Sequence, residues 1–170
     1  CDIAYYHSGE DLNNKGLQDI EHAMRHMKKA ESNYKWDYFK DIESLRKHRL
    51  TALQECANDM KESSERYIPV NLPSLPFKND EFEILLSAHF LFMYADRLDY
   101  LFHLETLNEL LRVTKEEVRI FPLVDLEGKR YKHLDKIFSY LADCNYIVEE
   151  IKVPYEFQTN ANSMLKIRKG

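Results

Sequence analysis

Short apolar runs alternate with helical segments along the second half of the chain, and this order constrains the fold more than any other feature. Phe82 to Ala88 has the composition of a strand, Asp99 to Arg112 repeats leucine at helical spacing, and Val118 to Leu123 is again strand-like. A strand, a helix and a strand in this order predict two parallel strands joined by a helical crossover. We therefore expect an α/β fold.

The other apolar runs extend this sheet. The run Ile84-Leu85-Leu86 has no polar alternation, which is typical of a strand covered by helices on both faces, so we expect Phe82 to Ala88 to be a central strand. Residues Tyr131 to Cys144 predict another helix, and further strands are expected near Ile147 to Val153 and Met164 to Ile167.

The first third of the chain is predicted to be helical. Apolar residues recur at helical spacing from Leu17 to Met27, and a second helix is expected from about Asp41 to Lys61, with Asp41 as its N-cap. No repeat or Gly/Ser linker separates this part from the rest. We therefore interpret residues 17–62 as a helical insertion in a single domain of residues 1–170, whose α/β part covers residues 65–170.

Composition excludes several classes of partner. The formal net charge is −5, and the 24 basic and 29 acidic residues are interspersed, so we expect no nucleic-acid partner. No apolar stretch approaches membrane-spanning length and no signal peptide opens the chain, so we expect no membrane association and a cytoplasmic protein. The three cysteines are widely spaced and have no CxxC pair, so we expect reduced thiols in the core.

The first residues predict the end of a strand. The chain opens with Cys1 rather than Met, so we expect that an upstream segment has been removed. Residues 1–6 read as the tail of a strand whose beginning lies upstream, and Tyr67 to Asn71 reads as another strand that leads into a proline-rich loop.

The segment that follows carries a family resemblance. The segment of residues 70–89, VNLPSLPFKNDEFEILLSAH, combines a polar residue, a short loop, an LPF triplet, a turn and an apolar strand. It resembles class I S-adenosylmethionine-dependent methyltransferases of the methyltransferase-domain-11 type. The resemblance covers residues 65–170 and extends to residues 1–6.

The resemblance implies a Rossmann-like three-layer sandwich that is incomplete at its N-terminus, because the glycine-rich first motif is not in the chain. It also implies S-adenosylmethionine as cofactor. Carried over by position, Asp2 with the adjoining Ile3 would hold the ribose hydroxyls, since an acidic residue ends the second strand in this family. Asn71 and the backbone of Leu72 would contact the adenine, and Asn71 stands where the family commonly has Asp. The methionine end would be bordered by Ser87, Ala88 and His89.

Two histidine patterns have alternative interpretations. His89 is a candidate general base that accepts a proton from the substrate nucleophile, and the alternative is a hydrogen-bonded core histidine. His22 and His26 stand one helical turn apart with Asp19 nearby, but without further ligands we interpret them as a solvated helix face and expect no metal site.

The methyl acceptor is expected to be a small molecule, because no basic aromatic stripe suggests a nucleic acid. A non-catalytic remnant of the fold that acts as an interaction module is the alternative, and it would self-associate through exposed sheet edges, pair with a missing piece or rearrange its sheet. A nicotinamide-dependent oxidoreductase would share the acidic strand-end residue but would not predict the LPF loop.

Overall fold

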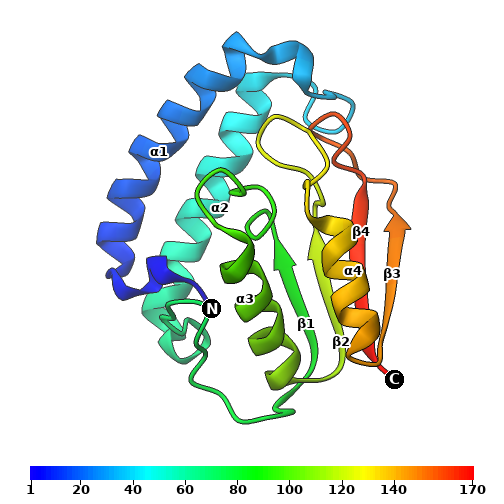
Figure 1. Ribbon diagram of the computed structural model, residues 1–170. Helices are drawn as coiled ribbons and strands as arrows, with labels where there is room; N and C mark the ends of the chain where they lie inside the picture. The colour runs from blue at the N-terminus through cyan, green and yellow to red at the C-terminus, as the bar shows by residue number, and fades with distance from the viewer. The chain divides into compact units, whose positions relative to one another are not determined.

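The computed structural model describes all 170 residues, and the chain divides into two compact units, Cys1–Asn71 and Leu72–Gly170. The N-terminal unit is helical, and the C-terminal unit is built on a sheet (Figure 1). None of the helices is both long and apolar enough to span a bilayer. The single domain over residues 1–170 stays a prediction.

Two long antiparallel helices form the N-terminal unit. Helix α1 spans Gly9–Lys29 and helix α2 spans Ile42–Glu62. Asp41 caps α2 as predicted, because its side chain accepts a hydrogen bond from the Ser44 N–H at 2.7 Å. Helix α1 begins well before Leu17, because the Ser8 hydroxyl caps it by accepting the Asp11 N–H.

The two helices pack through a small apolar seam. Met24 and Met27 of α1 and Leu45 and Ala57 of α2 are buried. A Cβ atom on Gly16 would lie 2.5 Å from a methyl carbon of Leu53, so glycine permits this close approach. Leu17 was expected in the apolar stripe but is 42% exposed.

The strands predicted at the start of the chain and at Tyr67 to Asn71 are wrong, because only one residue of each segment is paired. The two segments meet in a single parallel bridge between Asp2 and Pro69. Beyond it, the Asp2 carboxylate accepts the Ala4 N–H at 2.8 Å and caps a 3₁₀ helix, Ile3–Tyr6. This side-chain hydrogen bond competes with the extended conformation and ends the strand after one residue pair.

The C-terminal unit contains a four-stranded mixed sheet, which confirms the α/β class. Its strands are β1 (Phe82–Ala88), β2 (Thr114–Phe121), β3 (Tyr146–Lys152) and β4 (Ser163–Lys169). They lie in the order β1-β2-β4-β3. Strands β1 and β2 are parallel, as the predicted crossover requires, whereas β4 is antiparallel to both of its neighbours.

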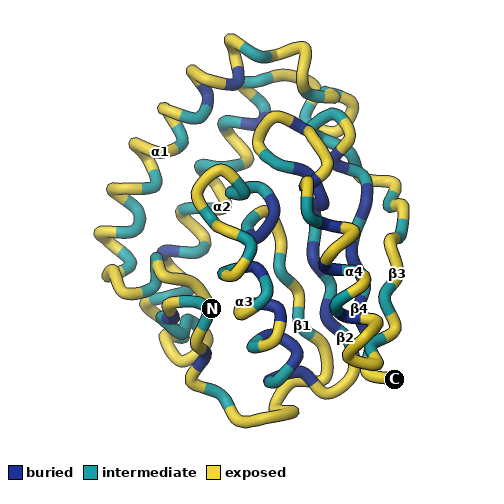
Figure 2. Tube along the Cα trace, in the orientation of Figure 1, coloured by how far each residue is buried: buried dark blue, intermediate teal, exposed yellow.

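Both helices of this unit, α3 (Tyr100–Val113) and α4 (Leu134–Asp143), cover the same face of the sheet (Figure 1). Beneath them lies the core, which appears as dark segments in Figure 2 and includes Val118, Ile120, Leu165 and Ile167. The opposite face of β2 and β4 is charged, with an ion pair of 2.8 Å between Lys166 and Glu117. Taken by itself, this unit therefore has two layers.

The prediction of a central position for Phe82 to Ala88 is wrong, because β1 lies at the end of the strand order. Its apolar side chains are correspondingly accessible, and Ile84 and Leu86 are 52% and 71% exposed. The continuous apolar run therefore does not reflect helices on both faces of β1 within this unit.

The cysteines are free thiols, but the expected core position is wrong. Cys1 and Cys144 are exposed, and Cys56 on α2 is half-buried. None of them contributes a fully buried side chain to the core.

Candidate functional site

The carboxyl ends of β1 and β2 form the candidate site of the C-terminal unit. The two parallel strands end together, since Ala88 pairs with Phe121, and the backbone N–H of His89 donates to the Phe121 carbonyl oxygen at 2.7 Å. Ligands in open α/β sheets bind beyond such carboxyl ends. Three of the predicted site residues, Ser87, Ala88 and His89, therefore lie where a ligand would meet the sheet.

His89 ends β1 in an unusual backbone conformation. Its φ angle is 55°, in the left-handed region that costs a non-glycine residue about 1 kcal/mol. Non-glycine residues in this region cluster at functional sites. The side chain is exposed, so the alternative of a core histidine is wrong. The imidazole is accessible to a ligand at the end of the sheet.

Two aromatic residues that the sequence analysis missed extend the site. The Phe121 ring packs edge-on against the His89 ring with centroids 5.5 Å apart, and the Tyr155 ring lies 6.1 Å from the Phe121 ring. Tyr155 belongs to the loop between β3 and β4. Aromatic rings provide contact surface for flat rings and for cations. The available signal was the position of Phe121 near the end of the predicted strand Val118 to Leu123.

A buried histidine fixes the loop that follows His89. His103 on α3 is fully buried, and its ring is stacked between those of Phe92 and Tyr131. Its Nε2 lies 2.9 Å from the Leu91 carbonyl oxygen and its Nδ1 lies 2.5 Å from that of Asp99. A ring N–H of His103 donates to at least one of these backbone carbonyl oxygens. His103 thereby connects both ends of the loop that leaves the site.

Burial also affects the neighbouring phenol. Tyr131 stacks on His103 and is almost fully buried. Burial raises the pKa of Tyr131 to about 12, and the nearby Tyr100 and Asp99 add to the effect. Tyr131 is therefore protonated throughout the physiological range and acts as packing for the His103 ring.

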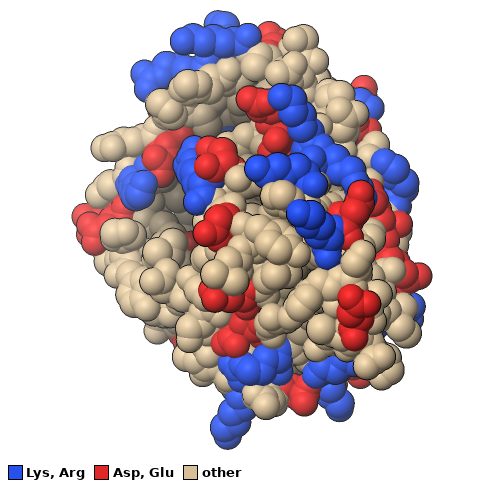
Figure 3. All heavy atoms as spheres, in the orientation of Figure 1, with Lys and Arg blue, Asp and Glu red and all other residues tan.

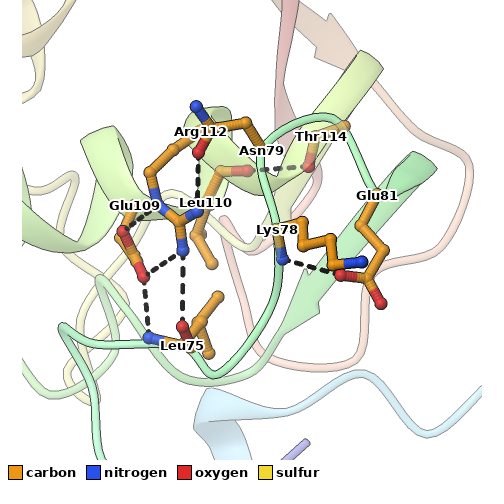
Figure 4. Close-up of polar contacts among 8 residues, drawn as sticks. All are labelled: Leu75, Lys78, Asn79, Glu81, Glu109, Leu110, Arg112 and Thr114. Carbon is orange, nitrogen blue, oxygen red and sulfur yellow. Dashed lines mark hydrogen bonds and ion pairs between the residues drawn. The ribbon is translucent and has the colours of Figure 1, made fainter.

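The LPF loop is anchored at the other end of β1. Glu109 of α3 accepts the Leu75 N–H at 2.7 Å, and Arg112 holds both carboxylate oxygens of Glu109 (Figure 4). Arg112 also donates to the Asn79 side chain at 2.8 Å. The hydrogen bonds from Arg112 lower the pKa of Glu109. This network positions the loop that begins at Leu72 without contributing to the carboxyl-end site.

The N-terminal unit holds the remaining predicted residues. The Asp2 N–H donates to the Ile68 carbonyl oxygen at 3.3 Å, so Asp2 lies beside the segment that ends at the exposed Asn71. Ile3 is 62% exposed. The structure thus brings Asp2 and Asn71 into one unit, and it brings Leu72 and the β1 end into the other.

Other polar groupings do not form a metal centre. No group of three His, Cys, Asp or Glu side chains is close enough to hold a metal ion. The His22 and His26 rings lie 4.4 Å apart, and Asp19 is paired with Lys15 instead. On α2, a hollow of about 530 Å³ is lined partly by acidic residues, among them Asp59, which accepts the Tyr67 hydroxyl and pairs with Arg66.

A comparison with known proteins finds a relative of this chain. The chain matches no model of a known protein family. It is 36% identical over 169 residues to the uncharacterized protein MJ0045 of Methanocaldococcus jannaschii. The match covers 99% of this chain and 74% of the relative.

Proposed function

The chain belongs to the family of the Methanocaldococcus jannaschii protein MJ0045, and we propose that it carries out S-adenosylmethionine-dependent methyl transfer to a small-molecule acceptor. The single observation that carries the proposal is the placement of Ser87, Ala88 and His89 at the carboxyl end of a parallel strand pair. The resemblance of residues 70–89 to class I methyltransferases predicts that the cofactor binds at this end of the strand pair.

Two parallel backbone pairings support a Rossmann-like arrangement. Strand β1, helix α3 and strand β2 form the predicted crossover, with β1 and β2 parallel. In the other unit, Asp2 and Pro69 form a parallel bridge across the two long helices. The C-terminal unit therefore supplies one parallel crossover of the kind that an α/β sandwich is built from, and the N-terminal unit supplies a single bridge in the same parallel sense.

The side chains of the N-terminal unit suit the polar part of the cofactor. One oxygen of the Asp2 carboxylate accepts the Ala4 N–H, and carboxylate oxygens together offer about four lone-pair sites, so capacity is left for ribose hydroxyls. The exposed Asn71 amide offers a donor and an acceptor to an adenine edge. Both predicted residues have the chemistry that the cofactor requires.

S-adenosylmethionine, when bound, supplies an electrophilic methyl group on a sulfonium. The part of this chain is then to align the acceptor, exclude water and take up a proton. His89 is accessible at the strand end and is proposed to accept the proton of the acceptor nucleophile. The rings of Phe121 and Tyr155 form an apolar wall against which a small acceptor would lie.

The second candidate function is an interaction module, and the edge position of β1 favours it. Its far edge pairs with no other strand, and Ile84 and Leu86 are exposed. Antiparallel pairing with β1 of a second copy, centred on Leu85, would place Ile84 opposite Leu86 of the second copy and oppose no like charges. Such an edge is a template for strand pairing.

Binding of S-adenosylhomocysteine, measured by calorimetry, distinguishes the two functions. We would titrate this chain, the longer MJ0045 protein, and an Asp2→Asn variant of this chain, with Asp41→Asn as its control. Asn keeps the acceptor that caps a helix but removes the charge and one acceptor oxygen. The methyltransferase proposal expects binding that is weakened by Asp2→Asn and unchanged by Asp41→Asn. Absence of binding by both wild-type proteins would leave the interaction module as the better account.

A further inference from the structure

Charge is segregated along the helical hairpin of the N-terminal unit. Residues 22–49 contain eight Lys and Arg residues and only four Asp and Glu residues. Residues 1–21 and 50–71 together contain three Lys and Arg residues and nine Asp and Glu residues. The whole-chain balance conceals this asymmetry, because the two ends of the hairpin offset each other. The end of the hairpin that contains the α1–α2 connection is therefore basic.

Antiparallel packing brings the basic parts of the two helices to the same end. Ala57 lies against Gly9 and Leu53 against Gly16, and Arg46 forms an ion pair of 2.5 Å with Glu21. The last two turns of α1 therefore lie beside the first turns of α2. Figure 3 shows Lys and Arg side chains gathered over the upper end of α1.

A hollow of about 510 Å³ lies within this basic end. Its lining consists of five residues of α1, all of them exposed and all basic or titratable to a positive charge: His22, Arg25, His26, Lys28 and Lys29. No acidic side chain lines it. We define these five residues as the α1 basic hollow.

The cations of the hollow differ from other cations of the same unit. Lys15, Arg46 and Arg66 each form an ion pair with a carboxylate. Arg25, Lys28 and Lys29 form none in the structure, although all residues of the unit are described. Their charges therefore remain available to an anion from outside the chain.

The helix dipole alone does not explain this arrangement. Cations in the last turn of a helix complement its partial negative charge, which accounts for Lys28 and Lys29. The dipole effect falls off beyond the last turn, and His22 and Arg25 lie further back on α1. Glu21 stands one helical turn before Arg25, but its carboxylate pairs with Arg46 of α2 instead.

We propose that the α1 basic hollow binds phosphate groups of a polyanionic ligand. Guanidinium and ammonium groups are the usual partners of phosphate oxygens, and the hollow presents both within two turns of one helix. The phosphates come either from a small polyphosphate compound such as a nucleotide or from the backbone of a nucleic-acid strand. The site is independent of the proposed methyl transfer.

The test measures binding of three probes by fluorescence anisotropy competition and calorimetry. The probes are inorganic tripolyphosphate, a single-stranded RNA of twelve nucleotides, and polyglutamate as an anion without phosphate. The test variant combines Arg25→Gln, Lys28→Gln and Lys29→Gln. The matched control combines Lys115→Gln, Lys132→Gln and Lys136→Gln, which are exposed positions of the C-terminal unit and change the net charge equally. Circular dichroism checks that both variants keep their helix content.

We expect the test variant to lose at least about tenfold in affinity for the phosphate probes and the control to change by less than about threefold, since three direct charge contacts are removed only in the former. Tripolyphosphate bound as tightly as RNA would identify a small ligand. Tighter RNA binding, with a salt slope that falls by about 2 in the test variant, would identify a strand. Absence of phosphate binding, equal losses in both variants, or equal binding of polyglutamate would overturn the proposal.

Discussion

The backbone N–H of His89 donates to the backbone carbonyl oxygen of Phe121 across the carboxyl ends of β1 and β2, at 2.7 Å. This hydrogen bond continues the parallel ladder by one residue after β1 has turned into the left-handed conformation. The strand therefore ends with its last backbone donor satisfied and with an accessible imidazole beside an aromatic ring.

The left-handed φ of His89 predicts that glycine is more stable than alanine at this position. His89→Gly and His89→Ala both remove the ring, but only the alanine variant keeps a Cβ in the left-handed region. We expect the glycine variant to have the larger free energy of unfolding, by about 1 kcal/mol. Urea denaturation measures the difference, and an alanine variant that is equally or more stable would contradict it. In the methyl-transfer assay, both variants should be inactive if His89 is the base.

The Glu109 network predicts a specific pH dependence. Because hydrogen bonds from Arg112 lower the folded pKa of Glu109, its contribution to stability is present above its ordinary value of 4.5 and is lost as the pH falls through the folded pKa. Glu109→Gln should therefore destabilise the protein by about 1–3 kcal/mol at pH 7, and the difference from wild type should shrink below pH 4.5. Unfolding measured between pH 3 and pH 7 checks this.

Glu105→Gln is the matched control for this experiment, since Glu105 is an exposed carboxylate on the same helix. Its stability difference from wild type should be small at every pH. A difference for Glu109→Gln that grows as the pH falls would show that the carboxylate is not stabilised by Arg112.

Two buried threonines on adjoining segments predict opposite responses to the same substitution. The Thr106 hydroxyl is buried without a hydrogen-bond partner, whereas the Thr114 hydroxyl donates to the Leu110 carbonyl oxygen at 2.7 Å. Thr106→Val should raise the free energy of unfolding by about 1 kcal/mol, because a desolvated hydroxyl is removed. Thr114→Val should lower it by a similar amount, because a hydrogen bond is lost. Thermal and urea unfolding of both variants give the answer, and a destabilised Thr106→Val would contradict the assignment.

The exposed edge of β1 predicts which substitution blocks self-association. Leu86→Lys places a charge on the unpaired edge strand, and charges on such strands prevent edge pairing. Ile147→Lys is the control, since Ile147 is an exposed apolar residue of β3, the strand at the other edge. If the protein dimerises in sedimentation experiments, only Leu86→Lys should restore the monomer. Equal effects of both variants would exclude pairing through β1.

Local patterns predicted most of the elements. Helical spacing and the Asp41 cap predicted α2 within one residue at each end, and the run from Phe82 to Ala88 predicted β1 at its observed bounds. These features depend on interactions within a few residues, such as capping and side-chain periodicity. The same reasoning failed at Ile3–Tyr6, where a side-chain hydrogen bond from Asp2 outweighs the strand preference of the following residues.

Only part of the candidate site could be predicted from the sequence. Ser87 to His89 were carried over by position from the family resemblance, and the structure places them at the carboxyl end of a parallel strand. Phe121, Tyr155 and His103 were missed, because their relation to the site depends on contacts between segments far apart in the chain. No local pattern reports that both nitrogens of His103 face carbonyl oxygens.

By itself, the sequence determined the α/β class, the helical first third and the strand–helix–strand unit, because periodicity and capping act over a few neighbouring residues. The tertiary structure decided that β1 lies at the edge of the sheet, that β4 lies between β2 and β3, and that Arg25, Lys28 and Lys29 of α1 form no ion pair. Strand order and charge pairing are set by which distant segments meet, and a composition averaged over the chain does not contain that information.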